Sequence, residues 1–279
     1  MSTHHTATEH LAIDFGIVIH AWGTLRQALR ALPGRFASSV ALTALLTWAA
    51  WRMQGPFHTW LSAAPAPFGD MVDFFYTLIV TALDSLVLAA TAIPVHRMVL
   101  LGETRDGVLA LFSGRTLRFA FWLIAVQMCG FLALLPLPLL FTATPAGRTA
   151  IVAGMAAFLV GLFVAAVRLS LALPAIAIDH PARGVFRRAV TSWSLSRGHF
   201  WRLIITAVFA MVPLLFLILL ATLAGSAVIG LTGPMVSMMD MLMWFEVAVT
   251  ALSRPLGAAL AAGVLSWNYK LARDELERA

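Results

Sequence analysis

Apolar stretches long enough to cross a membrane alternate with short polar segments along the whole chain. A transmembrane helix needs about 20 mainly apolar residues to cover a hydrocarbon core of about 30 Å. Six stretches reach or approach that length: residues 36–51, 71–95, 119–141, 151–178, 203–231 and 244–269. The pattern predicts an all-α polytopic membrane protein, with six transmembrane helices in a single integral membrane domain over residues 1–279.

The segment before the first apolar stretch has a different period. After a polar tail at residues 1–10, large apolar side chains recur every three or four residues along one face of a helix: Leu11, Phe15, Val18, Trp22, Leu25, Leu29 and Leu32. Pro33 and Gly34 end this helix and turn the chain. We therefore expect residues 11–35 to form an amphipathic helix that lies in the membrane interface.

Related features recur further along the chain. Apolar stripes also precede the third and fifth stretches, formed by Val108, Leu111 and Phe112 and by Phe186, Val190, Trp193 and Phe200. Three prolines follow at intervals of 80 and 81 residues, Pro94, Pro174 and Pro255. These features predict three helix-hairpin units, each preceded by a cytoplasmic amphipathic helix. The alternative is that three prolines are evenly spaced by chance.

Composition narrows the class of protein. Apolar residues make up 61% of the chain and charged residues only 11%, against roughly 25% charged in soluble domains. These values exclude a soluble globular domain and a disordered chain. The net charge of +6 would suit a nucleic-acid partner, but the basic residues cluster between apolar stretches. We therefore expect a lipid bilayer, and no nucleic acid, as the partner.

The basic residues divide unequally between the two sides of the membrane. Fifteen of the 19 lie on the side that holds the termini, and only Arg52 and Arg148 lie on the other. The positive-inside rule then places both termini, including a tail at residues 270–279, in the cytoplasm. The residues expected to contact anionic phospholipid headgroups at the inner leaflet are Arg26, Arg30, Arg183, Arg187 and Arg188.

Three charged residues lie well inside the predicted spans, away from their ends, where a charge costs about 2.5–3.5 kcal/mol on insertion scales. Asp84 and Arg254 fall at similar depths in two spans of the same direction, so we expect them to form an ion pair. The pair either fixes helix register or forms a polar functional site. Arg168 lies nearer the cytoplasm, where it either extends to the interface or holds a phosphate in a cavity.

No recognisable catalytic or metal-binding pattern is present in the sequence. The phosphate-binding loop, the H-E-x-x-H motif and the G-x-S-x-G motif are all missing. The histidines are scattered, and Cys129 is the single cysteine. We therefore expect no enzymatic activity, no metal and no cofactor.

Two stretches carry a resemblance to a known family. Residues 168–179, RLSLALPAIAID, and residues 192–203, SWSLSRGHFWRL, resemble the bacterial YciC-like family. They also resemble the six-span membrane domain found next to some glycerophosphodiester phosphodiesterases. The resemblance implies a multi-pass helical protein of the bacterial cytoplasmic (inner) membrane. We expect the phosphodiesterase domain to be absent here, so the resemblance transfers no catalytic residue.

Two functions fit these features. The first is a non-enzymatic membrane domain that handles lipid, or supports a membrane or cytoplasmic partner protein, from the inner leaflet. The alternative is a small transporter or lipid translocase that uses an intramembrane site at Asp84 and Arg254. Solvent access at Asp84 separates them, because transport requires a wet, alternately accessible site and a scaffold is consistent with a dry pair.

Overall fold

The computed structural model describes residues 7–62, 68–105, 107–134, 144–178, 185–232 and 238–278. All regular structure in these ranges is α-helical. The helices are α1 (Ala7–Ala31), α2 (Pro33–Ser62), α3 (Phe68–Leu101), α4 (Gly114–Leu134), α6 (Pro145–Leu169), α7 (Ala172–Ala177), α8 (Val185–Leu195), α9 (Phe200–Thr232) and α10 (Met238–Arg278). The all-α class predicted from the sequence is confirmed for this part of the chain.

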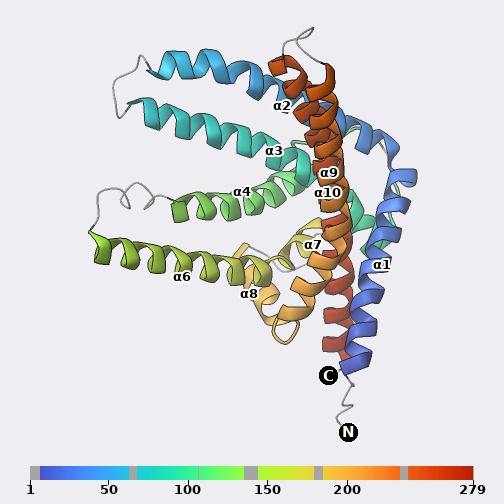
Figure 1. The fold of residues 1–279 in the computed structure, drawn as a ribbon. Helices are drawn as coiled ribbons and strands as arrows, with labels where there is room; N and C mark the ends of the chain where they lie inside the picture. The colour runs from blue at the N-terminus through green and yellow to red at the C-terminus, as the bar shows by residue number, and fades with distance from the viewer. Residues whose placement is uncertain are drawn as a thin grey trace.

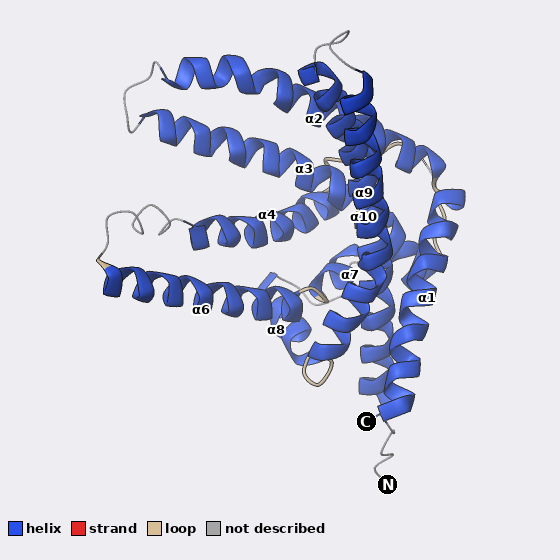
Figure 2. Ribbon diagram, in the orientation of Figure 1, coloured by secondary structure: helices blue, strands red, loops and turns tan. Residues whose placement is uncertain are grey.

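All the described helices except α7 and α8 fall into two groups (Figure 1). The first group, α2, α3, α4 and α6, lies in chain order, and each helix contacts the next. The second group consists of α1, α9 and α10, with the two termini of the chain at one end (Figure 1). Helix α10 contacts α1, α2, α3 and α9, so it joins the groups. Short loops and turns link the helices wherever the links are described (Figure 2).

Four helices in the described part of the chain are long and apolar enough to cross a membrane. They comprise Phe74–Leu101 of α3, Pro145–Leu169 (α6), Phe200–Ile229 of α9 and Asp240–Glu277 of α10. The coarse expectation of a polytopic membrane protein agrees with this finding, but six spans are not established. Helix α2 has the length, yet Ser39, Thr43 and Thr47 lower its hydropathy.

The fourth expected span, residues 151–178, is wrong as a single helix. Helix α6 ends at Leu169, and α7 starts at Ala172. The Ser170 hydroxyl donates to the carbonyl of Val167 at 2.7 Å, which satisfies an acceptor at the helix end. Pro174 has no N–H to continue the α-helical ladder across this break. Five of the six residues of α7 are buried inside the protein.

The expected amphipathic helix before the third span is also wrong. Residues 102–113 are irregular where they are described, and Val108 and Phe112 are 80% and 78% exposed. Gly102 and Gly107 adopt positive φ values of 71° and 151°, which disfavour helix for other residue types and break it here. The repeat of three equivalent units therefore fails at its second member.

Helix α1 is amphipathic, but its apolar face lies against protein. Ile17, Ala21, Leu25 and Leu32 are buried, and the last three join clusters that include residues of α3, α9 and α10. The approach is close at Gly263, where a Cβ would already lie in van der Waals contact, 3.4 Å from the Cα of Ala21. The expectation that this stripe rests in lipid is corrected for Leu25 and Leu32, whereas Phe15 and Leu29 of the same stripe are exposed.

Helix α10 runs without interruption from Met238 to Arg278. Its 41 residues make about 60 Å of helix, twice the thickness of a hydrocarbon core of about 30 Å. Residues 270–278 therefore continue a helix instead of forming a separate tail. Pro255 lies inside this helix, and the part after it packs on α1 through contacts such as the stacked rings of His20 and Trp267.

Candidate functional site

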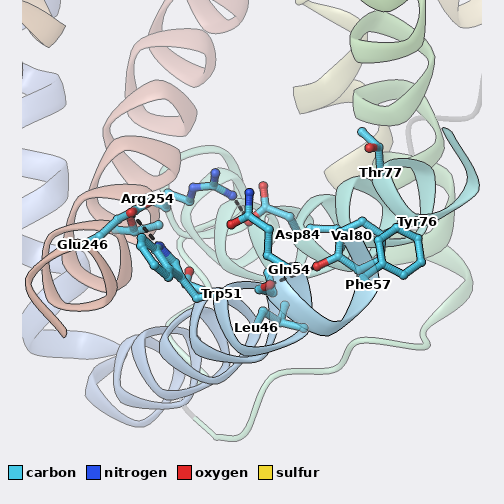
Figure 3. Close-up of a pocket in the computed structure, with 13 residues that line it drawn as sticks. Leu46, Trp51, Gln54, Phe57, Tyr76, Thr77, Val80, Asp84, Glu246 and Arg254 are labelled. Atoms are coloured by element: carbon cyan, nitrogen blue, oxygen red, sulfur yellow. Dashed lines mark hydrogen bonds and ion pairs between the residues drawn. The ribbon is translucent and has the colours of Figure 1, made fainter. Parts of the chain in front are cut away.

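Asp84 of α3 and Arg254 of α10 form an ion pair, as their depths in the sequence predict (Figure 3). The Nη1 atom of Arg254 contacts the Oδ1 atom of Asp84. The Asp84 side chain is 16% exposed and the Arg254 side chain is 48% exposed. The Asp84 side chain is therefore largely enclosed, whereas about half of the Arg254 side chain remains accessible.

The open side of the pair faces a cleft of about 470 Å³ between α2, α3 and α10 (Figure 3). Polar and aromatic side chains from all three helices line it: Thr47, Trp51, Gln54 and Phe57 of α2, Tyr76, Thr77 and Asp84 of α3, and Glu246, Thr250 and Arg254 of α10. A cleft of this kind can hold a ligand that has a polar group.

We call the cleft at Asp84 and Arg254 the outer cleft. Hydrogen bonds and a ring stack hold its wall in place. The indole Nε1 of Trp51 donates to Oε2 of Glu246 at 2.6 Å. The hydroxyl of Tyr76 donates to the carbonyl of Ala50 at 3.1 Å, and the Tyr76 ring stacks on Phe57 with centroids 4.6 Å apart. The sequence alone does not connect Glu246 to Trp51.

A second cleft of about 270 Å³ lies between α2, α3 and the start of α4. Sequence reasoning did not find it. Four arginines line it: Arg35, Arg97, Arg105 and Arg115. Arg97 makes two hydrogen bonds to the carboxylate of Glu103, at 2.8 and 2.6 Å. The Nε of Arg35 donates to the carbonyl of Arg105 at 3.1 Å, so the loop after α3 is tied to the start of α2.

Arg168 lines neither of these clefts. Its guanidinium lies over the Trp193 ring, 4.7 Å from the centroid, a cation–π contact with α8. Its carbonyl accepts a hydrogen bond from the Ser192 hydroxyl at 2.7 Å. The Nε atom of Arg168 is buried without a hydrogen-bond partner. Arg168 therefore links α6 to α8, and it is separate from the pair formed by Asp84 and Arg254.

The arginines expected at the inner leaflet are only partly described. Arg26 and Arg30 are exposed on α1 and line a shallow groove on the face opposite its buried stripe. Arg187 and Arg188 belong to α8, but their side chains lie outside the described structure. Arg183 lies outside the described residues altogether.

Chemistry that needs a metal cluster finds no support in the described structure, where no group of three or more His, Cys, Asp or Glu side chains gathers. The fold and the clefts define a helical protein with several apolar helices suited to a membrane. Comparison with protein families, characterised proteins and solved structures gives no match. The function must therefore be argued from the clefts themselves.

Proposed function

We propose that the protein is a small membrane transporter or lipid translocase whose binding site is the outer cleft at Asp84 and Arg254. One observation carries this proposal. A cleft with polar walls lies between α3 and α10, two helices long and apolar enough to span a membrane. Charged groups inside a membrane are costly and usually mark a ligand pathway.

The pair also offers a plausible binding reaction. Arginine presents a planar fork of donors that suits phosphate and carboxylate groups. Because half of the Arg254 side chain is exposed, an anionic group of a ligand can approach it without unfolding the cleft. The ligand then replaces Asp84 as the partner of the guanidinium. No covalent step is needed, which accords with a protein that is not an enzyme.

The lipid-handling function expected first from the sequence has separate support from α1. The exposed face of this helix carries Phe15, Ile19 and Leu29, which are 50%, 69% and 41% exposed. Arg26 and Arg30 lie on the same exposed side. Apolar side chains beside arginines are typical of contact with an anionic lipid surface. We propose this contact at the inner leaflet of a bacterial inner membrane, with both termini in the cytoplasm.

Access to the cleft from both sides of the membrane tests the transport function without knowledge of the substrate. The full chain carries Cys129→Ser and Thr250→Cys, so the only thiol lies in the wall of the outer cleft. Right-side-out and inside-out membrane vesicles are treated with a membrane-impermeant sulfonate thiol reagent. Leu217→Cys, on an exposed apolar face of α9, is the matched control that should not react.

A transporter predicts labelling at position 250 from both sides. Labelling from one side only would indicate a static binding site and refute transport. No labelling from either side would indicate a dry ion pair and favour the scaffold. Binding of the whole protein to vesicles that contain anionic lipid does not distinguish these cases, because α1 accounts for it in each of them.

A further inference from the structure

We propose that the seam between α2 and α3 is a path for a small anion between the two clefts, closed in this structure at Ser39 and Thr91. This inference rests on the proposed transport function and adds to it a second binding site, a route and a class of substrate. The anion is of the phosphate, sulfonate or carboxylate type, either free or as part of a lipid headgroup.

A stripe of hydrogen-bonding side chains along α2 joins the two clefts. It consists of residues four apart, which form a row that winds around the helix by about 40° per step: Arg35, Ser39, Thr43, Thr47 and Trp51. Arg35 lines the second, arginine-lined cleft, which we call the inner cleft. Thr47 and Trp51 line the outer cleft. From Arg35 to Gln54, at the far end of the outer cleft, 19 steps of the helix cover about 28 Å. This length matches a hydrocarbon core of about 30 Å.

A hydrogen bond between α2 and α3 closes the seam near the inner end of the stripe. The hydroxyl oxygens of Ser39 and Thr91 lie 2.7 Å apart, and both residues are buried. Thr91 donates to the carbonyl of Val87 at 2.8 Å, so Ser39 donates to Thr91. The neighbouring side chains on α3, Val87 and Ala90, are apolar and buried. This contact is the narrow point of the path.

Thr43 supplies independent evidence that the seam is not a simple apolar contact. It is 2% exposed, and its hydroxyl oxygen has no hydrogen-bond partner. An unsatisfied buried polar group costs about 1–3 kcal/mol and needs an explanation such as a water or a ligand. The hydroxyl lies between Ser39 and Thr47 on the stripe, where a passing polar solute would satisfy it.

The inner cleft has the charge for an anion. Four arginines line it against one described carboxylate, Glu103. Asp106, in the same segment of the sequence, lies outside the described residues, and counting it still leaves an excess of two positive charges. Pro94 also lines this cleft. Its missing N–H removes the helical donor of the Ala90 carbonyl, which weakens α3 at the point where the seam would open.

The two clefts hold their arginines in the same way. Asp84 holds Arg254 in the outer cleft, and Glu103 holds Arg97 in the inner cleft. At each end an incoming anion can take the place of the carboxylate on the guanidinium. The path therefore begins and ends at an arginine with an exchangeable partner, which favours an anion over a cation.

A reversible cross-link tests the path in the full chain. Ser39→Cys and Thr91→Cys are added to the chain with Cys129→Ser and Thr250→Cys. Because the two hydroxyl oxygens are 2.7 Å apart, the introduced thiols lie within reach of a disulfide. Mild oxidation joins them, and labelling at position 250 is read by peptide mass mapping, because the seam thiols also react with the reagent when they are reduced. The probe is the sulfonate thiol reagent, itself a small anion, applied from the cytoplasmic side, and a trimethylammonium reagent serves as its cationic counterpart.

We expect oxidation to slow cytoplasmic-side labelling by the sulfonate reagent at least tenfold and reduction to restore it. In variants with only one of the two seam thiols, oxidation should leave the labelling rate unchanged. In the reduced protein, the sulfonate should react faster than the cation after correction for their rates with a free thiol. A parallel arm follows a headgroup-labelled phospholipid in proteoliposomes. If oxidation blocks both lipid exchange and labelling, the anion is a lipid headgroup. If oxidation blocks labelling alone, the anion is a free solute.

The failures of the path and of the transport function are distinguishable. If the disulfide forms completely and labelling from the cytoplasmic side continues, the path lies elsewhere and the transport function survives. If the cation reacts as fast as the sulfonate, the anion is the wrong class of substrate. If the reduced protein shows no labelling from the cytoplasmic side, as in the simpler chain with Thr250→Cys alone, the transport function itself is refuted.

Discussion

The ion pair between Asp84 and Arg254 predicts an unequal response to removal of either partner. Asp84→Asn leaves a guanidinium that is already half exposed, whereas Arg254→Gln leaves a carboxylate whose side chain is only 16% exposed. A buried charge that loses its partner is strongly destabilising, whereas a solvated one is not. We therefore expect Arg254→Gln to cost more free energy of unfolding than Asp84→Asn.

The magnitudes follow from the exposures. Loss of a charge-assisted hydrogen bond to a partly solvated group sets the cost of Asp84→Asn at about 1–3 kcal/mol. Loss of one partner from a buried pair is worth about 3–5 kcal/mol. Arg254→Gln is therefore expected to cost about 3–5 kcal/mol, and the double variant less than the sum.

The assay is the unfolding midpoint of the purified protein in mixed micelles with a rising fraction of dodecyl sulfate. The exposed pair of Arg273 and Glu277 on the same helix provides the matched control, because Glu277→Gln should cost less than about 1 kcal/mol. Equal costs for Asp84→Asn and Arg254→Gln would refute the unequal burial. Costs that add fully in the double variant would refute the ion pair itself.

Three further predictions concern contacts outside this pair. Trp51→Phe removes the hydrogen bond to Glu246 and should cost about 1 kcal/mol in the same unfolding assay, so a value near zero would contradict that contact. Gly263→Val should destabilise by about 1–3 kcal/mol through a clash with Ala21 of α1 and raise the rate of proteolysis in α1, while Gly263→Ala should stay close to the parent. Burial, aided by Arg202 and opposed by Glu275, lowers the pKa of His199 below 6.5. Stability should then fall as the pH drops through 6.5 toward the folded pKa, because the unfolded state binds the proton more readily, and His199→Gln should flatten this unfolding-midpoint profile between pH 7.5 and 5.5.

The sequence predicts the elements of this protein better than their packing. Apolar runs in the sequence predicted the positions of α3, α9 and α10. The depths of Asp84 and Arg254 in their spans predicted the ion pair between these two residues. The same runs did not reveal the break after Leu169, because Ser170 and the residues of α7 are as compatible with a span as with a short buried helix. Hydropathy measures how apolar a segment is, and it carries no information on which neighbour covers it.

Helix α1 shows this limit in detail. Its apolar period correctly predicted an amphipathic helix, but the partner was wrong for the buried part of the stripe, because lipid and the faces of α9 and α10 present equally apolar surfaces. The informative residue is Gly263, where a side chain larger than a methyl group would meet the backbone of α1. A single glycine in an apolar helix has several explanations, so the sequence alone does not select this one.

The polar residues of the path proposed above also contribute to the low hydropathy of α2. In the described part of the chain, α2 is long enough to cross a membrane but is not among the helices that are apolar enough. Three of the residues that lower its hydropathy, Ser39, Thr43 and Thr47, lie close together on one side of the helix. Arg35 and Trp51 continue this row around the helix into the two clefts.

A helix that only anchors a protein in lipid gains nothing from such a stripe, because each buried hydroxyl needs a partner that lipid does not supply. A helix that lines a polar route needs the stripe on the side that faces the route and apolar residues elsewhere. Replacement of the stripe by apolar residues of similar size, Ser39→Ala with Thr43→Val, should therefore strengthen membrane insertion of α2. The same replacement should slow the reagent that travels from the cytoplasmic side to position 250. Stronger insertion of α2 without slower labelling at position 250 would show that α2 does not line the route.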